Sequence, residues 1–219
     1  MADARVDGRK AMELRPMQCD LALLDKPDGS ASFSFGDSSV MAAVYGPRDV
    51  PLSREKHDRS TVEVAWHSAP DNEQGAALQS HLTEFVVNAL ASIHDFPRSA
   101  IRVVIQELNN DGGMLACAIN ATCLALMDAG ISLTAMFAAA SCAVVDGQLI
   151  LDPTLIEQNK ANAVVVTGAC KQASKVNAAE FVALHSSGPC APKQMVTVLE
   201  AVESATAAVA AFLRTAKSK

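Results

Sequence analysis

The sequence predicts an α+β fold with mixed sheets, a buried central helix and a long C-terminal helix. Three observations support this prediction. Short apolar segments bounded by turn residues begin the chain and return after its middle, as strands do. The segment Leu115–Ala129 is apolar nearly all round, which is typical of a buried helix. The last segment carries an apolar stripe at helical spacing.

The first third of the chain reads as strands. Pro27, Asp28 and Gly29 form a strong turn signal between the first two, and such short connections require antiparallel pairing. A polar loop, Pro47–Arg59, then leads to a segment that alternates apolar and polar residues. The predicted strands are Cys19–Leu24, Ala31–Gly36, Ser39–Tyr45 and Thr61–His67.

The middle of the chain alternates helix and strand. Apolar residues at helical spacing between Leu78 and Ile93 predict a helix, which Pro97 ends. The strand-like segment Ile101–Leu108 follows. The residues Asn109–Gly113 form a turn into the buried helix, and Gly130 caps the end of that helix.

The last third predicts a second strand block and a final helix. Asp146 and Gly147 give a hairpin signal between the first two strands of this block. The final helix begins after Pro192, and the tail after Arg214 is expected to fray. The predicted strands are Ala135–Val145, Leu149–Leu151, Ala163–Gly168 and Phe181–His185.

The composition predicts a single soluble domain over residues 1–219. Half of the 219 residues are hydrophobic, so a substantial core can form. The N-terminus lacks an apolar signal region, and the longest apolar stretch is too short to span a bilayer. The net charge of −6 makes the isolated chain a poor RNA binder, because phosphates are bound by Lys and Arg.

The cysteines indicate a reducing, intracellular compartment. None of the six forms a CxxC pair, so the sequence predicts no zinc or other metal site. Cys117, Cys123 and Cys142 lie in apolar runs and are expected to be reduced core thiols. The five histidines lie in no recognisable nucleophile motif, and we interpret them as surface or structural residues.

Three long segments resemble one family. The chain carries an LRP start, a DGSA turn, a GDSSV strand and a DGGMLACAIN helix start. This combination resembles the RNase PH-like proteins, and more narrowly the exosome ring subunits of the component-five type. The resemblance implies an RNase PH-like fold (ribosomal protein S5 domain 2-like) of two βαβα-type halves. The segments that carry it are Leu14–Pro47, Asn109–Ile131 and Asp146–Val166.

The resemblance also implies where the chemistry of active members lies. These cleave RNA from its 3′ end with inorganic phosphate, which sits at the N-terminus of the buried helix, where free N–H groups favour an anion. Their motif is similar to DGGTRTAA, and its Thr-Arg pair clamps the phosphate. Here Gly112 and Gly113 remain, but Met114 and Leu115 stand in the Thr and Arg positions. We interpret these four residues as a phosphate-binding relic.

Two further parts of the implied active site are reduced. Active members carry several acids in a pattern like EEDxxADxD, whereas Leu155–Asn162 retains Glu157 alone. Their RNA-gripping arginines have no counterpart on the first helix, which carries His81 and Glu84. The family reading is therefore a non-catalytic ring subunit that scaffolds 3′–5′ RNA processing and degradation, without phosphorolytic activity.

Two alternatives stay open at this point. The chain could be a free-standing, homodimeric, metal-dependent nuclease acting on RNA or DNA, with Asp111 and Glu157 as catalytic candidates. No cofactor is predicted otherwise, and Mg²⁺ belongs to this alternative alone. Asp152 and Glu157 could form a minimal metal site, but solvated loop acids are favoured. A pure interaction module without RNA contact is the third possibility.

The sequence also suggests contact residues and partners. In the loop Pro47–Arg59, acidic residues alternate with the basic ones. This pattern favours a solvated loop of mixed charge over an RNA contact. Arg5, Arg9, Lys10 and Arg15 form a second basic cluster. The resemblance implies other RNase PH-like exosome subunits and S1/KH cap proteins as partners, and RNA as the ligand, with DNA as an alternative ligand. It implies no membrane, and the nucleus, nucleolus and cytoplasm as location. The contact candidates are Arg48, Arg54, Lys56, Arg59, Arg98 and Arg102.

Overall fold

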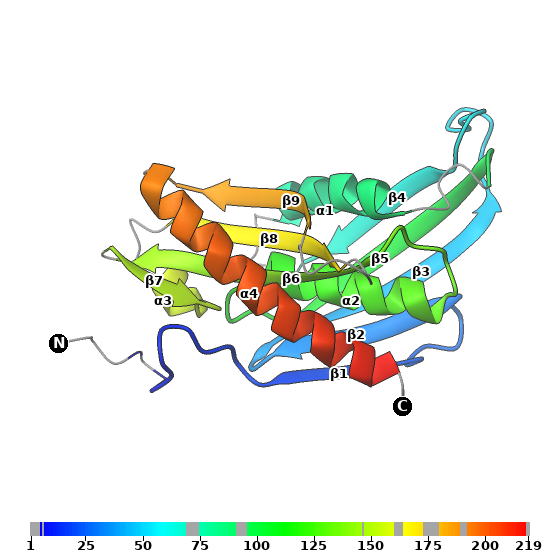
Figure 1. The fold of residues 1–219 in the computed structure, drawn as a ribbon. Helices are drawn as coiled ribbons and strands as arrows, with labels where there is room; N and C mark the ends of the chain where they lie inside the picture. The colour runs from blue at the N-terminus through cyan, green and yellow to red at the C-terminus, as the bar shows by residue number, and fades with distance from the viewer. Residues whose placement is uncertain are drawn as a thin grey trace.

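The computed structural model contains two β-sheets, with helices packed between and across them (Figure 1). It describes residues 5, 7–68, 75–90, 96–145, 147–159, 164–172, 180–188 and 192–217. This arrangement of mixed sheets, a buried helix and a long last helix confirms the predicted α+β class.

The first sheet has five strands in the order β1-β2-β3-β5-β4. The pairs from β1 to β5 are antiparallel, as the tight turns predict, whereas β4 runs parallel to β5. A parallel pair needs a crossover, and α1 (Gly75–Ala89) lies in it. The strands are β1 (Met17–Leu21), β2 (Gly29–Phe35), β3 (Ser38–Asp49), β4 (Thr61–His67) and β5 (Ser99–Asn109).

The second sheet has four antiparallel strands in the order β7-β6-β8-β9. The short helix α3 (Leu155–Asn159) follows β7, and α4 (Pro192–Lys217) runs diagonally across the molecule (Figure 1). The strands are β6 (Met136–Val145), β7 (Gln148–Leu151), β8 (Val164–Gln172) and β9 (Glu180–Ser187).

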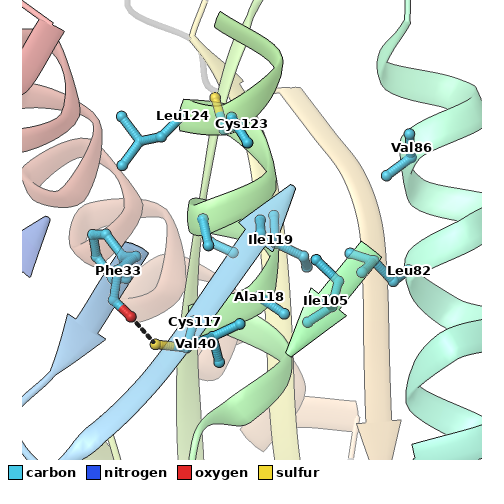
Figure 2. Packing of buried hydrophobic residues seen from close by; sticks show 14 of the residues in the cluster. Phe33, Val40, Leu82, Val86, Ile105, Cys117, Ala118, Ile119, Cys123 and Leu124 are labelled. Atoms are coloured by element: carbon cyan, nitrogen blue, oxygen red, sulfur yellow. Dashed lines mark hydrogen bonds between the residues drawn. The ribbon is translucent and has the colours of Figure 1, made fainter. Parts of the chain in front are cut away.

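The buried central helix is α2 (Met114–Asp128), which is enclosed along almost its whole length. On one side it packs against Phe33 and Val40 of the first sheet, and Leu82 and Val86 of α1 lie beyond Ile105 (Figure 2). On the other side the amide of Asn120 accepts from Ala139 N at 2.8 Å and donates to Ala139 O at 3.0 Å. The helix therefore connects both sheets, and its one buried amide is fully paired.

The last helix is long and apolar enough, by length and composition, to cross a membrane over Gln194–Ala216. Its apolar stripe nevertheless has a place within the fold. Val198 and Val202 pack against Cys142 and Leu151 of the second sheet, and Val209 and Leu213 join the main core. Packing inside the protein therefore accounts for this stripe.

Several predicted boundaries are wrong. The strand predicted to end at Tyr45 continues to Asp49, because after an irregularity β3 pairs again with β5. The last helix continues through the tail to Lys217 instead of fraying after Arg214. The helix α3 was not expected at all. The first helix ends at Ala89, and the predicted remainder, 91–93, lies outside the described residues.

Candidate functional site

The turn before α2 is held by close contact with the chain after β7. Asn110 accepts a side-chain hydrogen bond from Gly112 N at 3.0 Å, and Leu155 N donates to Asp111 O at 3.1 Å. Gly112 has φ +89°, and a Cβ there would lie 2.6 Å from Pro153 O. This position therefore requires glycine, because two backbone segments meet there.

The first residues of α2 present apolar side chains where the resemblance expects a phosphate clamp. Met114 and Leu115 are both buried, and Leu115 lines a cavity of about 270 Å³ between α1, α2 and β9. His81, Glu84 and His185 line the same cavity. The first turn of α2 therefore supplies no guanidinium for an anion at this helix start.

The side chain of Arg15 occupies the space beside this turn. Its guanidinium donates two hydrogen bonds to Asp152, at 2.8 and 2.7 Å, and one to the Asp111 carboxylate at 3.1 Å. It also donates to the Gly112 carbonyl at 3.2 Å. Burial opposes the charge, but Asp152 and then Asp111 outweigh it and raise the pKa of Arg15.

A second buried arginine holds Glu157. Arg5 donates to both carboxylate oxygens of Glu157, at 2.9 and 2.8 Å, and also to the Leu151 and Asp152 carbonyls. Thr154 N donates to Glu157 at 2.9 Å, and Glu157 N donates to the Thr154 hydroxyl, so the pair forms a capping box at α3. Although burial opposes ionisation, the hydrogen bonds from Arg5 and Thr154 lower the pKa of Glu157.

These contacts change the interpretation of the acidic candidates. Asp152 and Glu157 are buried, so the expectation of solvated loop acids is wrong. Arg5 and Arg15 are buried as well, and they are not part of a basic surface cluster. Arg9 joins the same group through Asp7 and through Asp152 at 3.4 Å. We call Arg5, Arg9, Arg15, Asp7, Asp111, Asp152 and Glu157 the arm network, because the N-terminal arm supplies its cations.

The predicted contact residues separate into two groups. Arg48, Arg54 and Arg102 line a cavity of about 500 Å³ on the outer face of the first sheet. Lys56, Arg59 and Arg98 lie beyond it, at the β3–β4 loop and the start of β5. Here Arg98 N donates to Lys56 O at 3.1 Å, and its guanidinium lies 3.3 Å from Glu55.

Other residues near these sites had no clear signal in the sequence. Tyr45 and His67 line the outer cavity. Tyr45 on β3 becomes a neighbour of Arg102, and His67 on β4 a neighbour of Gln106, only through strand pairing. The rings of His81 and His185 lie 4.0 Å apart, although they are 104 residues apart in the sequence (185 − 81). Burial, and then the nearby His81, lower the pKa of His185. Arg102, which lies exposed in an apolar strand, is the neighbour of these residues that the sequence did predict as a contact.

Comparison with known proteins gives consistent matches. Residues 13–132 match domain 1 of the 3′ exoribonuclease (RNase PH) family, and residues 135–208 match its domain 2. The chain is 37% identical, over 73% of its length and 67% of the relative, to an Arabidopsis thaliana protein named exosome complex exonuclease RRP46 homolog.

Solved structures give the same result. The fold matches the crystal structure of rice (Oryza sativa) Rrp46 with a TM-score of 0.90 and 29% identity, over 98% of this chain and 100% of the other. A chain of an archaeal exosome core matches with a TM-score of 0.81 and 19% identity, over 96% and 91% of the two chains. The predicted RNase PH-like fold is thereby confirmed.

Proposed function

The chain belongs to the 3′ exoribonuclease family of RNase PH, and we propose on this basis that it is a non-catalytic subunit of an RNA exosome ring. The names of its relatives support the ring assignment, since they are an exosome RRP46 homolog and rice Rrp46. In this role the chain scaffolds a particle in which other subunits supply the 3′–5′ nuclease.

The observation that carries the non-catalytic part is the apolar start of α2. Leu115 is buried and faces α1, so α2 offers backbone N–H groups but no cation to a phosphate. The nearby Arg15 is already paired with Asp152 and Asp111. The first helix adds no Lys or Arg along its length. Phosphorolysis requires a phosphate held in a fixed orientation, and a helix terminus without a guanidinium binds it weakly.

The alternative of a metal-dependent nuclease gains no support from the two carboxylates suggested for it. Asp111 and Glu157 are each hydrogen-bonded to an arginine guanidinium, which competes with a cation for the same oxygens. Within the residues that the structure describes, no group of three His, Cys, Asp or Glu side chains is arranged to hold a metal ion. We therefore assign both acids to folding.

The proposed partners are other RNase PH-like subunits, S1/KH cap proteins and RNA. The exposed basic residues of the β3–β4 loop and β5 are the proposed RNA or partner contacts. Several of them already pair with acids, such as Arg54 with Glu63 at 3.0 Å, so they would exchange partners on binding. The proposal implies a location in the nucleus, nucleolus and cytoplasm, where exosomes act.

Two measurements test this function. Affinity purification of the full chain from cells that express it should recover RNase PH-like sister subunits, and recovery of the chain alone would contradict the ring role. The purified chain, incubated with labelled single-stranded RNA and inorganic phosphate, should release no nucleoside diphosphates. Phosphate-dependent release by the native chain would contradict the non-catalytic assignment.

A further inference from the structure

We propose that the outer face of the first sheet is a binding site for single-stranded nucleic acid, in which Tyr45 stacks on a base and Arg102 contacts a phosphate. The proposal rests on the proposed function in one respect only, namely that the ligand of the protein is RNA. It assigns a second surface, separate from the start of α2.

The outer face of this sheet is uncovered within the described part of the chain. Along β5, Ile101, Val103 and Ile105 are buried in the core, whereas Arg102 and Gln106, on the opposite face, are exposed. The cavity of about 500 Å³ lies on this exposed side and is floored by Ala100 and Val104. Its volume lies in the range of small-ligand sites, so it can accept a nucleotide but not a duplex.

Strand pairing brings the key side chains together. Tyr45 on β3 and Glu63 on β4 are both direct partners of Arg102 on β5, so the three form one row across the sheet. Direct partners on one face have Cβ atoms about 5 Å apart. The guanidinium carbon of Arg48 lies 5.1 Å from the centre of the Tyr45 ring. An aromatic ring is thus flanked by two guanidinium groups.

The charges of the cavity favour an anion. Arg48, Arg54 and Arg102 oppose Asp49 and Glu63, and His67 lies at the edge. Arg54 is paired with Glu63 and Arg48 with Asp28, but Arg102 makes no ion pair with any residue that the structure describes. Arg102 is therefore an uncommitted cation in the middle of a sheet, next to an aromatic ring.

The combination of ring and cation selects the class of ligand. An acidic peptide would use the arginines but not the face of Tyr45. Single-stranded nucleic acid uses both, because bases stack on aromatic side chains while phosphates pair with arginines. Because the whole chain carries a net charge of −6, few phosphates can be contacted, and the affinity should be modest and salt-sensitive.

The chain offers a direct probe, since Tyr45 is its only tyrosine. We would label the full chain with 3-fluorotyrosine and titrate it with a short oligouridylate at low salt. A saturable shift of the single ¹⁹F resonance is expected. Arg102→Gln should weaken binding about tenfold. It should also reduce the slope of log affinity against log salt concentration by about one. Arg214→Gln, on exposed α4, removes the same charge and should leave binding unchanged.

A parallel test examines the ring of Tyr45. Fluorescence anisotropy with labelled RNA should show that Tyr45→Phe binds like the native chain, while Tyr45→Ala binds about tenfold more weakly. Thermal unfolding of both variants establishes that the fold is retained. Arg102→Gln provides the test that leaves the ring in place, should Tyr45→Ala fail to fold.

The outcomes are separable from those of the proposed function. An absent ¹⁹F shift, or equal losses for Arg102→Gln and Arg214→Gln, would overturn the site. An equal shift with an acidic peptide such as polyglutamate would overturn nucleic acid as the ligand and indicate a protein partner. None of these measurements uses sister subunits or cleavage. Failure of co-purification would therefore contradict the ring role without affecting the measured binding of nucleic acid at the outer face of the first sheet.

Discussion

At the scale of single residues, the arm network shows how buried charges are tolerated. Each carboxylate oxygen in the Arg5–Glu157 pair has a donor, and the remaining guanidinium protons reach backbone carbonyls. A buried ion pair contributes little net stability over an apolar pair, but the loss of one partner leaves an uncompensated charge. The network is therefore sensitive to single substitutions rather than to paired ones.

Glu157→Ala should lower the free energy of unfolding by about 3 kcal/mol, because Arg5 stays buried without its partner. Arg48→Ala is the control, since both side chains of its pair with Asp28 are exposed and the pair should contribute less than about 1 kcal/mol. Urea denaturation of both variants measures the difference. Equal losses would mean that the burial of the Arg5–Glu157 pair has no energetic effect.

The depressed pKa of Glu157 gives a pH prediction. In the unfolded chain this carboxyl titrates near its ordinary value of 4.5, and in the folded protein it titrates lower. Its stabilising contribution is therefore full above the unfolded value and is lost as the pH falls through 4.5 toward the folded value. The stability of Glu157→Gln should fall less steeply than that of the native protein between about pH 5 and 3.

The buried thiols should be chemically inert. Burial raises the pKa of Cys117 to about 12, and that of Cys142 likewise to about 12, so almost no thiolate forms at pH 8. Cys19 is half-buried and should react before the buried Cys117, Cys123 and Cys142. Alkylation of the native protein followed by peptide mass spectrometry tests this order. Early modification of Cys117 would contradict the buried environment described for α2.

At the scale of elements, strands and long helices could be predicted and short or pairing-dependent ones could not. Alternation and turn residues identify β4 and β5, and a segment apolar all round identifies α2. The helix α3 has only five residues and depends on a capping box, whose Glu157 is held by Arg5 from 152 residues away. The end of β3 depends on its partner β5. The capping box itself is a local pattern, Thr154 to Glu157, but the contact from Arg5 and the pairing of β3 with β5 are not local.

The same distinction between local signals and long-range contacts explains which site residues could be predicted from the sequence. The apolar start of α2 at Met114 and Leu115 could be predicted, because those positions follow a recognisable turn. The burial of Asp152 could not, because its partner Arg15 lies 137 residues earlier. The row of Tyr45, Arg102 and Glu63 arises from the register of three strands, two of them parallel. Sequence spacing carries no information on that register.

The contact between the turn and the chain after β7 predicts a strong effect at Gly112. Gly112→Ala should destabilise the protein by more than about 2 kcal/mol, because a Cβ would meet Pro153 O at 2.6 Å in a strained backbone conformation. At Gly147 the φ is also positive, +79°, but nothing lies within 4 Å. Gly147→Ala should therefore cost only about 1 kcal/mol, from strain alone. Thermal and urea unfolding compare the two; equal effects would mean that the close approach is relieved elsewhere.

At the scale of the whole molecule, α2 and the His81–His185 contact join the two sheets. The histidine contact connects α1 on the first sheet to β9 at the edge of the second, with Glu84 of α1 beside it. Because the two sheets share these connections, we expect them to unfold together rather than as independent halves.

The histidine contact adds a second pH prediction. Burial and His81 lower the pKa of His185 below its ordinary value of 6.5, so the unfolded chain binds this proton more readily. The contribution of neutral His185 to stability is therefore full above pH 6.5 and declines as the pH falls below that value. His185→Phe should flatten the stability profile between about pH 7 and 5. An unchanged slope in that range would show that the histidine contact does not respond to protonation.

The arm network also has a consequence for the order in which the protein is made. Arg5 and Arg15 leave the ribosome first, but the carboxylates of Asp152 and Glu157 that receive them are translated 137 and 152 residues later. At ordinary elongation rates the arm waits roughly 7 to 30 seconds for its counterions. During that interval Arg5 and Arg15 lack the carboxylates that they bind in the folded protein. The closing of this network is thus a late event in biosynthesis, timed by translation of the second sheet.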